Sequence, residues 1–291
     1  MTKTAAVVVT YNRKDLLRQC VEHIRAQSAP ADILVIDNAS TDGTAELFAQ
    51  LREGIIYFNT GANLGGAGGF NFGMRKAAEM GYEFIWVMDD DTMPSPEAHE
   101  KLLEVNDLLE GNYGWLSSLV LWKDGTPCAM NVQKITKWKP LKDFEYSQTV
   151  QYASFVSLFI KADTVREFGL PYKEFFIWGD DWEFTRRISK EKPCFFVPGS
   201  VVSHHCASNT GADIVTADPA RLDRFRYLYR NDVVLYRQDG IEGFAYMVLR
   251  IAKHTAKIIL KSGGKAQKLK LMFSSLREGI KFKPEKESIE S

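Results

Sequence analysis

The sequence predicts an α/β fold, with a mixed and mainly parallel sheet flanked by helices, followed by a basic amphipathic helical C-terminal region. Over the first hundred residues, strand and helix patterns alternate with short connections, which is typical of a parallel sheet covered by helices on both faces. The 291 residues are 45% apolar and 25% charged, an ordinary globular composition that argues against disorder, collagen or a coiled coil. The length allows one large domain or two small ones.

The elements follow from hydrophobic periodicity. Short apolar runs predict buried strands, and apolar residues three or four positions apart, such as Leu17, Cys20, Val21 and Ile24, predict helices. We expect strands at Thr4–Val9, Ile33–Ile36, Ile55–Phe58 and Phe84–Met88, and helices at Lys14–Gln27, Thr44–Leu51 and Glu97–Leu109. A glycine-rich turn at Gly61–Gly69 should lead into a further helix that ends near Met80.

The second half is less regular. Its signals predict a hairpin turn at Lys123–Thr126, a strand within Tyr152–Ile160, a helix from Asp180 or Asp181, short strands in Phe195–Val202, and helices at Ala217–Tyr236 and Ile241–Leu260. The four cysteines are far apart in sequence, so reduced thiols in a cytosolic protein are the simplest interpretation. The first residues lack the pattern of a signal peptide, and no run of 18 apolar residues indicates a transmembrane helix.

Polar residues follow the predicted strands at the edge where ligands bind in such sheets. They are Thr10-Tyr11-Asn12-Arg13, Asp37-Asn38 and Asp89-Asp90-Asp91, with Asn63 and its following glycines after a fourth strand. Because these strand ends share one edge, the sequence predicts a single site there.

Asp89-Asp90-Asp91 is the sharpest of these features. Three adjacent carboxylates repel one another, and a divalent cation such as Mg²⁺ or Mn²⁺ would compensate their charge. If the strand continues, Asp89 and Asp91 share a face and Asp90 points away. The alternative is a solvated acidic turn.

Three other segments have a functional and a structural interpretation each. Gly65, Gly66, Gly68 and Gly69 lack the dinucleotide-binding spacing, so they either let a phosphate or sugar approach a helix N-terminus or serve tight packing. Asp180 and Asp181, flanked by Trp178 and Trp182, suit a poorly solvated general base or a helix cap. His204-His205 ends an apolar strand and suits metal or phosphate contact or a structural role.

Together these segments resemble the family of inverting glycosyltransferases with the nucleotide-sugar-binding GT-A fold, family two of the usual classification. The resemblance runs from Val7 to about Tyr236, through Val8–Arg13, Val35–Thr44, the acidic triplet and Asp180-Asp181. It implies nucleotide-sugar contacts from Thr10, Tyr11, Asn12, Arg13, Asp37, Asn38, Asn63, Gly65, Gly66, Gly68, Gly69, Asp89, Asp90 and Trp178. It also implies catalytic carboxylates at Asp181 and Asp180, and Asp89 and Asp91 as ligands of Mn²⁺ or Mg²⁺.

A narrower resemblance is to galactofuranosyltransferases. It rests on Asn63–Phe70, Trp178–Phe184, Pro198-Gly199 with His204, and Leu228–Asn231. It implies UDP-galactofuranose as the donor, His204 as a third metal ligand with His205 as the alternative, and Asp181 as the base that deprotonates the acceptor. The long N-terminal β-domain of the polymerising members is absent from this sequence, so the acceptor and the number of sugars added do not carry over.

The neutral total of 37 basic and 37 acidic residues hides an uneven distribution. Residues 241–284 hold ten basic residues and two acids, a net charge of +8, whereas residues 1–240 carry −6. Lys253, Lys257, Lys261 and Lys265 have the spacing of one helix face, and the basic amphipathic pattern predicts contact with an anionic membrane surface. The alternative is a packed helix with a solvated charged face.

The sequence therefore predicts a catalytic domain at residues 1–240 and a basic helical region at residues 241–291. We expect a cytoplasmic enzyme, peripheral on the inner face of the membrane, that uses a lipid-linked glycan acceptor in cell-surface polysaccharide (O-antigen) synthesis. No nucleic-acid partner is expected. A rhamnosyl- or hexopyranosyltransferase, a nucleotidyltransferase, and a non-catalytic membrane- or nucleic-acid-binding module are the alternatives.

Overall fold

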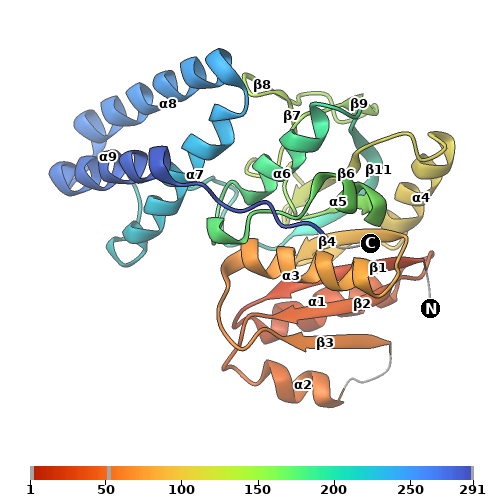
Figure 1. Ribbon diagram of the computed structural model, residues 1–291. Helices are drawn as coiled ribbons and strands as arrows, with labels where there is room; N and C mark the ends of the chain where they lie inside the picture. Colours follow the sequence, from red (N-terminus) through yellow and green to blue (C-terminus); the bar gives the residue numbers. More distant parts are fainter. Residues whose placement is uncertain (1–2, 51–53, 290–291) are drawn as a thin grey trace.

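A computed structural model describes residues 3–50 and 54–289 and contains one large sheet with helices on both faces (Figure 1). The strands of this sheet are β1 (Thr4–Thr10), β2 (Asp32–Asp37), β3 (Ile55–Asn59), β4 (Phe84–Asp89), β5 (Thr92–Pro94), β6 (Trp115–Trp122), β9 (Gln148–Thr149), β10 (Leu158–Lys161) and β11 (Phe195–His204). Two short strands, β7 (Lys134–Thr136) and β8 (Lys139–Pro140), pair separately.

The strand order is β3-β2-β1-β4-β10-β6-β11-β5, with β9 beside β11. The first four strands are parallel, β10 runs antiparallel between β4 and β6, and β6 is parallel to β11. This mixed sheet flanked by helices confirms the predicted fold class.

The helices are α1 (Lys14–Arg25), α2 (Thr44–Gln50), α3 (Gly65–Glu79), α4 (Ala98–Leu108), α5 (Ala162–Phe168), α6 (Asp180–Ser189), α7 (Phe225–Arg237), α8 (Gly240–Lys261) and α9 (Lys265–Lys281). Short 3-10 turns lie at Lys173–Phe175 and Pro219–Arg224. The predicted end of the second helix, Leu51, lies outside the described residues.

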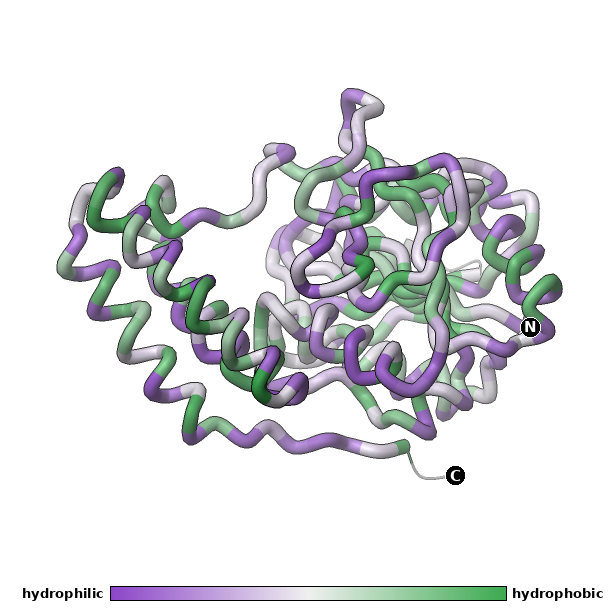
Figure 2. The backbone as a smooth tube through the Cα atoms, turned by 90° about the horizontal axis from the view of Figure 1, so that it is seen from above, coloured by the Kyte–Doolittle hydropathy of each residue, from purple (hydrophilic) through white to green (hydrophobic). Residues whose placement is uncertain are grey.

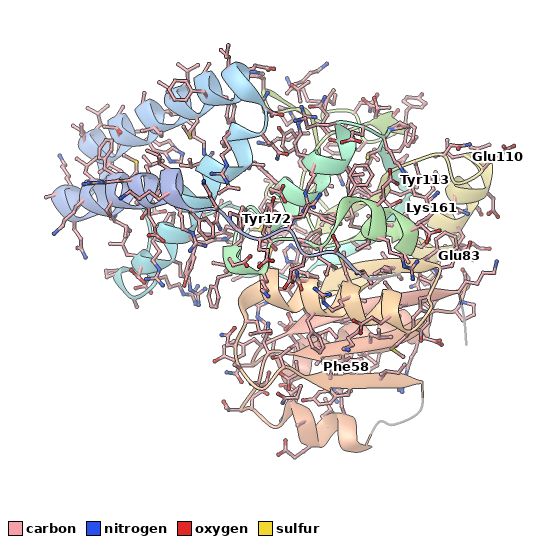
Figure 3. All side chains as sticks on the ribbon, in the orientation of Figure 1. Phe58, Glu83, Glu110, Tyr113, Lys161 and Tyr172 are labelled. Atoms are coloured by element: carbon pink, nitrogen blue, oxygen red, sulfur yellow. The ribbon has the colours of Figure 1, made fainter. Side chains whose placement is uncertain are left out.

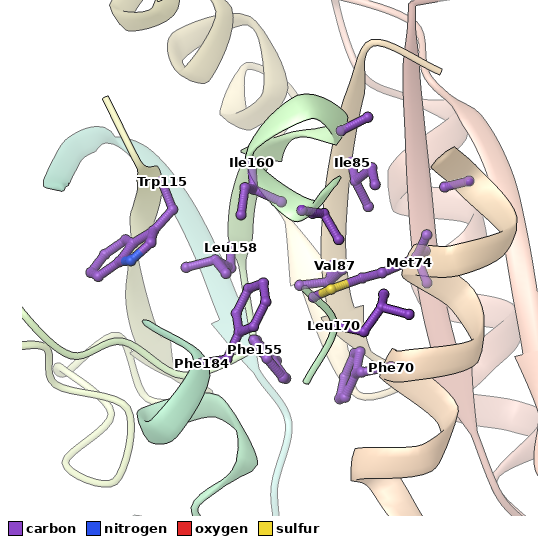
Figure 4. Packing of buried hydrophobic residues seen from close by; sticks show 14 of the residues in the cluster. Phe70, Met74, Ile85, Val87, Trp115, Phe155, Leu158, Ile160, Leu170 and Phe184 are labelled. Atoms are coloured by element: carbon purple, nitrogen blue, oxygen red, sulfur yellow. The ribbon is translucent and has the colours of Figure 1, made fainter. Parts of the chain in front are cut away.

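Alternation along the central strand creates a core on each face of the sheet. Ala5, Val7 and Val9 of β1 pack with α3, α5 and α6, whereas Ala6 and Val8 pack with α1 and α4. Figure 4 shows the first of these cores, in which Met74 of α3 reaches toward Val87 of β4 and Phe70 of α3 lies near Leu170. At the end of β10, Lys161 lies over the Tyr113 ring (Figure 3).

Several predicted elements differ from the structure. The expected glycine-rich turn is already helical from Gly65, and only Leu158–Lys161 of the expected strand in Tyr152–Ile160 forms one. The strands expected in Phe195–Val202 form one strand that continues to His204, with a register shift between Val197 and Val201. The predicted turn at Lys123–Thr126 is present, because the Trp122 N–H donates to the Thr126 carbonyl over 2.7 Å.

The basic C-terminal region forms two helices that project beside α7 (Figure 1). Polar and apolar residues alternate along both (Figure 2). Ile258 of α8 and Met272 of α9 are buried against Phe225 and Tyr229 of α7. No helix in residues 3–50 and 54–289 has the length and hydrophobicity needed to cross a bilayer.

The predicted row of four lysines on one helix face is wrong. Lys261 ends α8 and Lys265 begins α9 after the glycine pair Gly263-Gly264, so one helix carries only the first three lysines. One of them, Lys257, pairs with Asp213 at 3.2 Å. Two further basic residues of the region are used internally: Arg250 pairs with Asp232, and buried Lys268 donates to the Val215 carbonyl over 2.8 Å.

Candidate active site

The acidic triplet lies where β4 ends and β5 begins. Because β5 pairs antiparallel with the end of β11, Thr92 lies opposite His204, and the histidine is brought to the aspartates across the sheet. His204 Nε2 lies 3.1 Å from Asp91 Oδ1. One ligand atom each from Asp89, Asp91 and His204 fit within 4.8 Å of one another, a spacing that suits a metal ion.

The other ring nitrogen of His204 is held by two residues that sequence reasoning missed. Asn131 Oδ1 lies 2.8 Å from His204 Nδ1, and Cys128 Sγ lies 3.7 Å from the same atom. A hydrogen bond from Nδ1 to the amide oxygen orients the ring so that Nε2 faces the aspartates, as is usual for metal-binding histidines. Cys128, His204 and Cys206 form a second compact group of possible ligands.

His205 is placed differently. Its backbone N–H donates to the Asp91 carbonyl over 2.8 Å, and its half-buried side chain belongs to neither ligand group within the described parts of the chain. The structure therefore brings His204, and not His205, to Asp89 and Asp91.

The charges in this cluster are strongly coupled. Burial, reinforced by the charge of Asp91, raises the pKa of Asp89 to about 6. Burial alone would lower the pKa of His204, but the hydrogen bonds to Asp91 and Cys128 outweigh it and raise that pKa to about 10. Without a metal, His204 is thus an imidazolium paired with the Asp91 carboxylate.

Asp90 is not part of this ligand group, but β4 ends at Asp89, so Asp90 and Asp91 lie in the turn before β5 rather than on a continued strand. It accepts hydrogen bonds from Thr10 Oγ1 over 2.7 Å and from Arg13 over 3.2 Å, and Arg13 also contacts Asp91 over 2.6 Å. Burial raises the pKa of Asp90 to about 7. The side chains of Thr10 and Arg13 therefore bind the acidic triplet, and the backbone of Thr10 lies opposite Asp37 of β2.

Asp37 is fully buried at the end of β2. It accepts hydrogen bonds from the Tyr57 hydroxyl over 2.5 Å and from the Ser40 N–H over 2.8 Å. The neighbouring loops are tied together by Asn12, whose Oδ1 accepts from the Thr41 N–H over 2.7 Å. Tyr11 beside it is exposed.

The glycines divide into two groups. A Cβ on Gly65 would lie 2.1 Å from the Phe176 carbonyl oxygen, and one on Gly69 would lie 2.4 Å from Val9 Cγ1, so both permit close packing of α3. Gly68 packs tightly against Leu64. Gly66 alone of the four has open space beside it. Asn63 Oδ1 caps the turn by accepting from the Gly65 N–H over 2.9 Å, and Asn38 donates to the Gly65 carbonyl over 3.0 Å.

Asp180 and Asp181 open helix α6 after a sharp turn in which Trp178 and Gly179 have positive φ. Asn231 of α7 holds this turn, since its Nδ2 lies within 2.8 to 3.2 Å of the carbonyl oxygens of Phe175, Ile177 and Trp178. Burial raises the pKa of Asp181 to about 7, and burial together with the charge of Asp181 holds the pKa of Asp180 well above its ordinary range. The Asp181 carboxylate accepts a hydrogen bond from the adjacent Trp182 N–H in the first turn of α6 over 2.7 Å, so the capping interpretation applies to it as well.

One cavity of about 730 Å³ joins these groups. Its lining includes Asp89, Asp91, His204, Asp180, Asp181, Trp178, Arg13 and Gly66. The remaining predicted contacts lie outside this lining: Thr10, Tyr11, Asn12, Asp37, Asn38, Asn63, Gly65, Gly68, Gly69 and Asp90. The predicted metal ligands and the predicted base thus line one cavity. Most of the predicted nucleoside contacts lie outside its lining.

The chain is similar in sequence to known glycosyltransferases. Residues 5–108 match the model of glycosyl transferase family 2. The chain is 28% identical over 260 residues to galactofuranosyltransferase GlfT1 of Mycolicibacterium smegmatis, covering 81% of this chain and 83% of that protein. It is 24% identical over 237 residues to an N-acetylglucosaminyl-diphospho-decaprenol L-rhamnosyltransferase of Mycobacterium tuberculosis, covering 71% of this chain and 77% of that protein.

Solved structures show the same fold. GalNAc-T7 with UDP, GalNAc and Mn²⁺ superposes with a TM-score of 0.63 at 16% identity, over 96% of this chain and 56% of that one. S. aureus TarS 1-349 in complex with UDP gives a TM-score of 0.57 at 13% identity, over 97% of this chain and 72% of that one. These likenesses confirm the predicted GT-A fold.

Proposed function

We propose that this chain, a glycosyltransferase enzyme with a family 2 domain at residues 5–108, transfers galactofuranose from UDP-galactofuranose to a lipid-linked glycan in polysaccharide synthesis such as that of O-antigen. The observation that carries this proposal is the single cavity that Asp89, Asp91, His204 and Asp181 share. The similarity to a galactofuranosyltransferase over four-fifths of the chain supports the donor. The similarity to a transferase whose name specifies a diphospho-decaprenol substrate supports the acceptor class.

The residues at the end of β4 fit a divalent cation. Two carboxylates and an imidazole suit Mn²⁺ or Mg²⁺, whose remaining positions the diphosphate and water would fill. When bound, the ion supplies positive charge that stabilises the departing nucleoside diphosphate. His204 must first lose the proton from Nε2, while Nδ1 keeps its hydrogen bond to Asn131.

Asp181 is the proposed general base. It removes the proton from the acceptor hydroxyl, whose oxygen attacks the anomeric carbon on the face opposite the diphosphate, so one displacement inverts that centre. A pKa near neutrality suits this task. Asp180 precedes it, is buried and lines the same cavity, and we assign it a supporting role in the same turn.

The nucleoside side of the donor is assigned to the loops at the carboxyl ends of β1, β2 and β3. Asp37 and the loop that contains Asn12 are the proposed nucleoside-binding residues. Arg13 follows this loop and contacts both Asp90 and Asp91, so it connects the nucleoside-binding loop to the metal site. Gly66 is the glycine at which a sugar or phosphate can approach the backbone.

We further propose that α8 and α9 hold the enzyme on the inner face of the cytoplasmic membrane. Their exposed apolar side chains are Ile241, Phe244, Val248, Leu249, Ile259, Leu260, Phe273 and Ile280. These are interspersed with basic residues of a segment whose net charge is +8, a combination typical of interfacial helices.

The donor is tested with a panel of UDP-galactofuranose, UDP-galactopyranose and dTDP-rhamnose, each with Mn²⁺ or with a chelator. The proposal expects Mn²⁺-dependent turnover of UDP-galactofuranose, lost in His204→Ala and kept in the matched His205→Ala. Preferential use of dTDP-rhamnose would instead establish the rhamnosyltransferase alternative. Full activity of His204→Ala would overturn the ligand assignment.

A further inference from the structure

The end of the active-site cavity beside Trp182 contains a cation that makes no ion pair with any residue that the structure describes. Lys134 lines the cavity from β7, and its Nζ lies 3.8 Å from the centre of the Trp182 ring. Within residues 3–50 and 54–289, this ammonium group has no carboxylate in ion-pair contact and no hydrogen-bond acceptor. Burial and the charge of Arg250 lower the pKa of Lys134 to about 8, as expected for a desolvated cation near another.

The surroundings show that this arrangement is specific to Lys134. Lys137, three residues later, is also buried, but its Nζ lies 3.2 Å from Asp239 and 3.1 Å from Glu242. Arg250 of α8 also lines the cavity and pairs with Asp232 at 2.8 Å. Lys134, Arg250 and Asp232 together leave this end of the cavity with one uncompensated positive charge.

The position of this charge connects two parts of the proposed mechanism. Trp182, beneath Lys134, follows the proposed base Asp181 directly in α6. Arg250 lies on the same helix as the exposed side chains of Phe244 and Leu249, which are each 59% exposed. The cationic end of the cavity therefore lies between the proposed base and the helix assigned to the membrane.

We propose that Lys134, supported by Arg250, binds the diphosphate group of a polyprenyl-linked acceptor. This inference rests on the proposed function, because it concerns the acceptor of the same transfer. A diphosphate compensates the unpaired charge through charge-assisted hydrogen bonds. It also leaves the acceptor sugar free to reach Asp181 while the prenyl chain follows α8 toward the bilayer.

A direct binding test uses farnesyl diphosphate and farnesol as probes, titrated into the whole protein by calorimetry. EDTA is present, so no metal at Asp89 and Asp91 captures the diphosphate. The wild type should bind farnesyl diphosphate at least about tenfold more tightly than farnesol, the effect of a charge-assisted contact. Lys134→Met, which keeps the packing over Trp182, should lose this difference. Lys134→Arg and the exposed control Lys139→Ala should keep it.

Equal binding of the two probes by the wild type, or a diphosphate preference that survives in Lys134→Met, would overturn the inference. A kinetic measurement distinguishes a role of Lys134 in acceptor binding from a purely structural role. Lys134→Met should raise KM for a diphosphate-bearing acceptor and leave kcat/KM for a neutral glycoside acceptor unchanged, whereas equal loss with both acceptors would indicate a merely structural lysine. The calorimetric test uses no donor, so failure of transfer from UDP-galactofuranose would refute the proposed donor without affecting this result.

Discussion

Replacing Asp181 by asparagine should abolish transfer and, at the same time, stabilise the fold. Asparagine has nearly the same shape but cannot accept the acceptor proton, so we expect kcat to fall by at least about a hundredfold. Donor binding should persist, because the proposed metal ligands Asp89, Asp91 and His204 are unchanged. The stability effect follows from the burial of the carboxylate, because burial raises the pKa of Asp181 from an ordinary value of 3.8 to about 7.

The size of that effect can be worked from this pKa. A rise of about three units corresponds to roughly 4 kcal/mol of unfavourable free energy in the ionised form, at about 1.4 kcal/mol per unit. The side chain is partly exposed, and solvent screening reduces this to about 2 kcal/mol. Because the folded pKa is raised, the penalty is absent below the unfolded pKa of 3.8, grows as the pH rises from there to about 7, and is complete above about 7.

The assay is thermal unfolding of the wild type and Asp181→Asn at two pH values, with exposed Asp15→Asn as the control. At about pH 8.5 the variant should melt roughly 5 °C higher, and near pH 4 the two proteins should melt together. A variant that turns over normally, or whose Tm difference is the same at both pH values, would refute the assignment of Asp181 as a desolvated base.

Three further predictions follow from the same geometry. The kcat of transfer should rise with pH through about 7, because Asp181 must be ionised to accept a proton, and a flat profile between pH 5.5 and 8.5 would contradict this. Mn²⁺ affinity, measured by calorimetry with UDP present, should fall about tenfold for each pH unit of acidification, since binding displaces the proton held on His204 with a pKa of about 10; a pH-independent affinity would show that His204 is not a ligand. Phe244→Asp with Leu249→Asp should abolish sedimentation with phosphatidylglycerol vesicles but preserve activity on a water-soluble acceptor, and undiminished sedimentation would place the membrane contact elsewhere.

The sequence specified the parallel half of the sheet well, because each strand there is an apolar run that the next helix follows closely. It also directed attention to Asp89 and Asp91, because strand ends in such sheets share one edge, whereas Asp181 was singled out by its flanking tryptophans and by the family resemblance. Only the structure could show which of His204 and His205 faces the aspartates. The position of His204 depends on β5, a strand of only three residues that ends at Pro94 and pairs with a segment more than a hundred positions away.

Other features depended on packing that no local pattern encodes. Gly65 and Gly69 suggested a turn, but they lie in α3, and glycine is needed at these positions because Phe176 and Val9 leave no room for a Cβ. Asn131 and Lys134 belong to an irregular segment without a motif, and their roles arise from contacts with His204 and Trp182. The regular spacing from Lys253 to Lys265 crosses the boundary between α8 and α9 at Gly263-Gly264. Periodicity alone did not detect this boundary.

The most direct test of the account is the anomeric configuration of the product formed from UDP-galactofuranose and a diphospholipid-linked glycan with Mn²⁺, determined by NMR. The account predicts addition of a galactofuranosyl residue whose configuration is opposite to that in the donor, formed by the wild type and not by Asp181→Asn. A product with retained configuration, or its formation by Asp181→Asn at the wild-type rate, would contradict the single displacement assisted by Asp181.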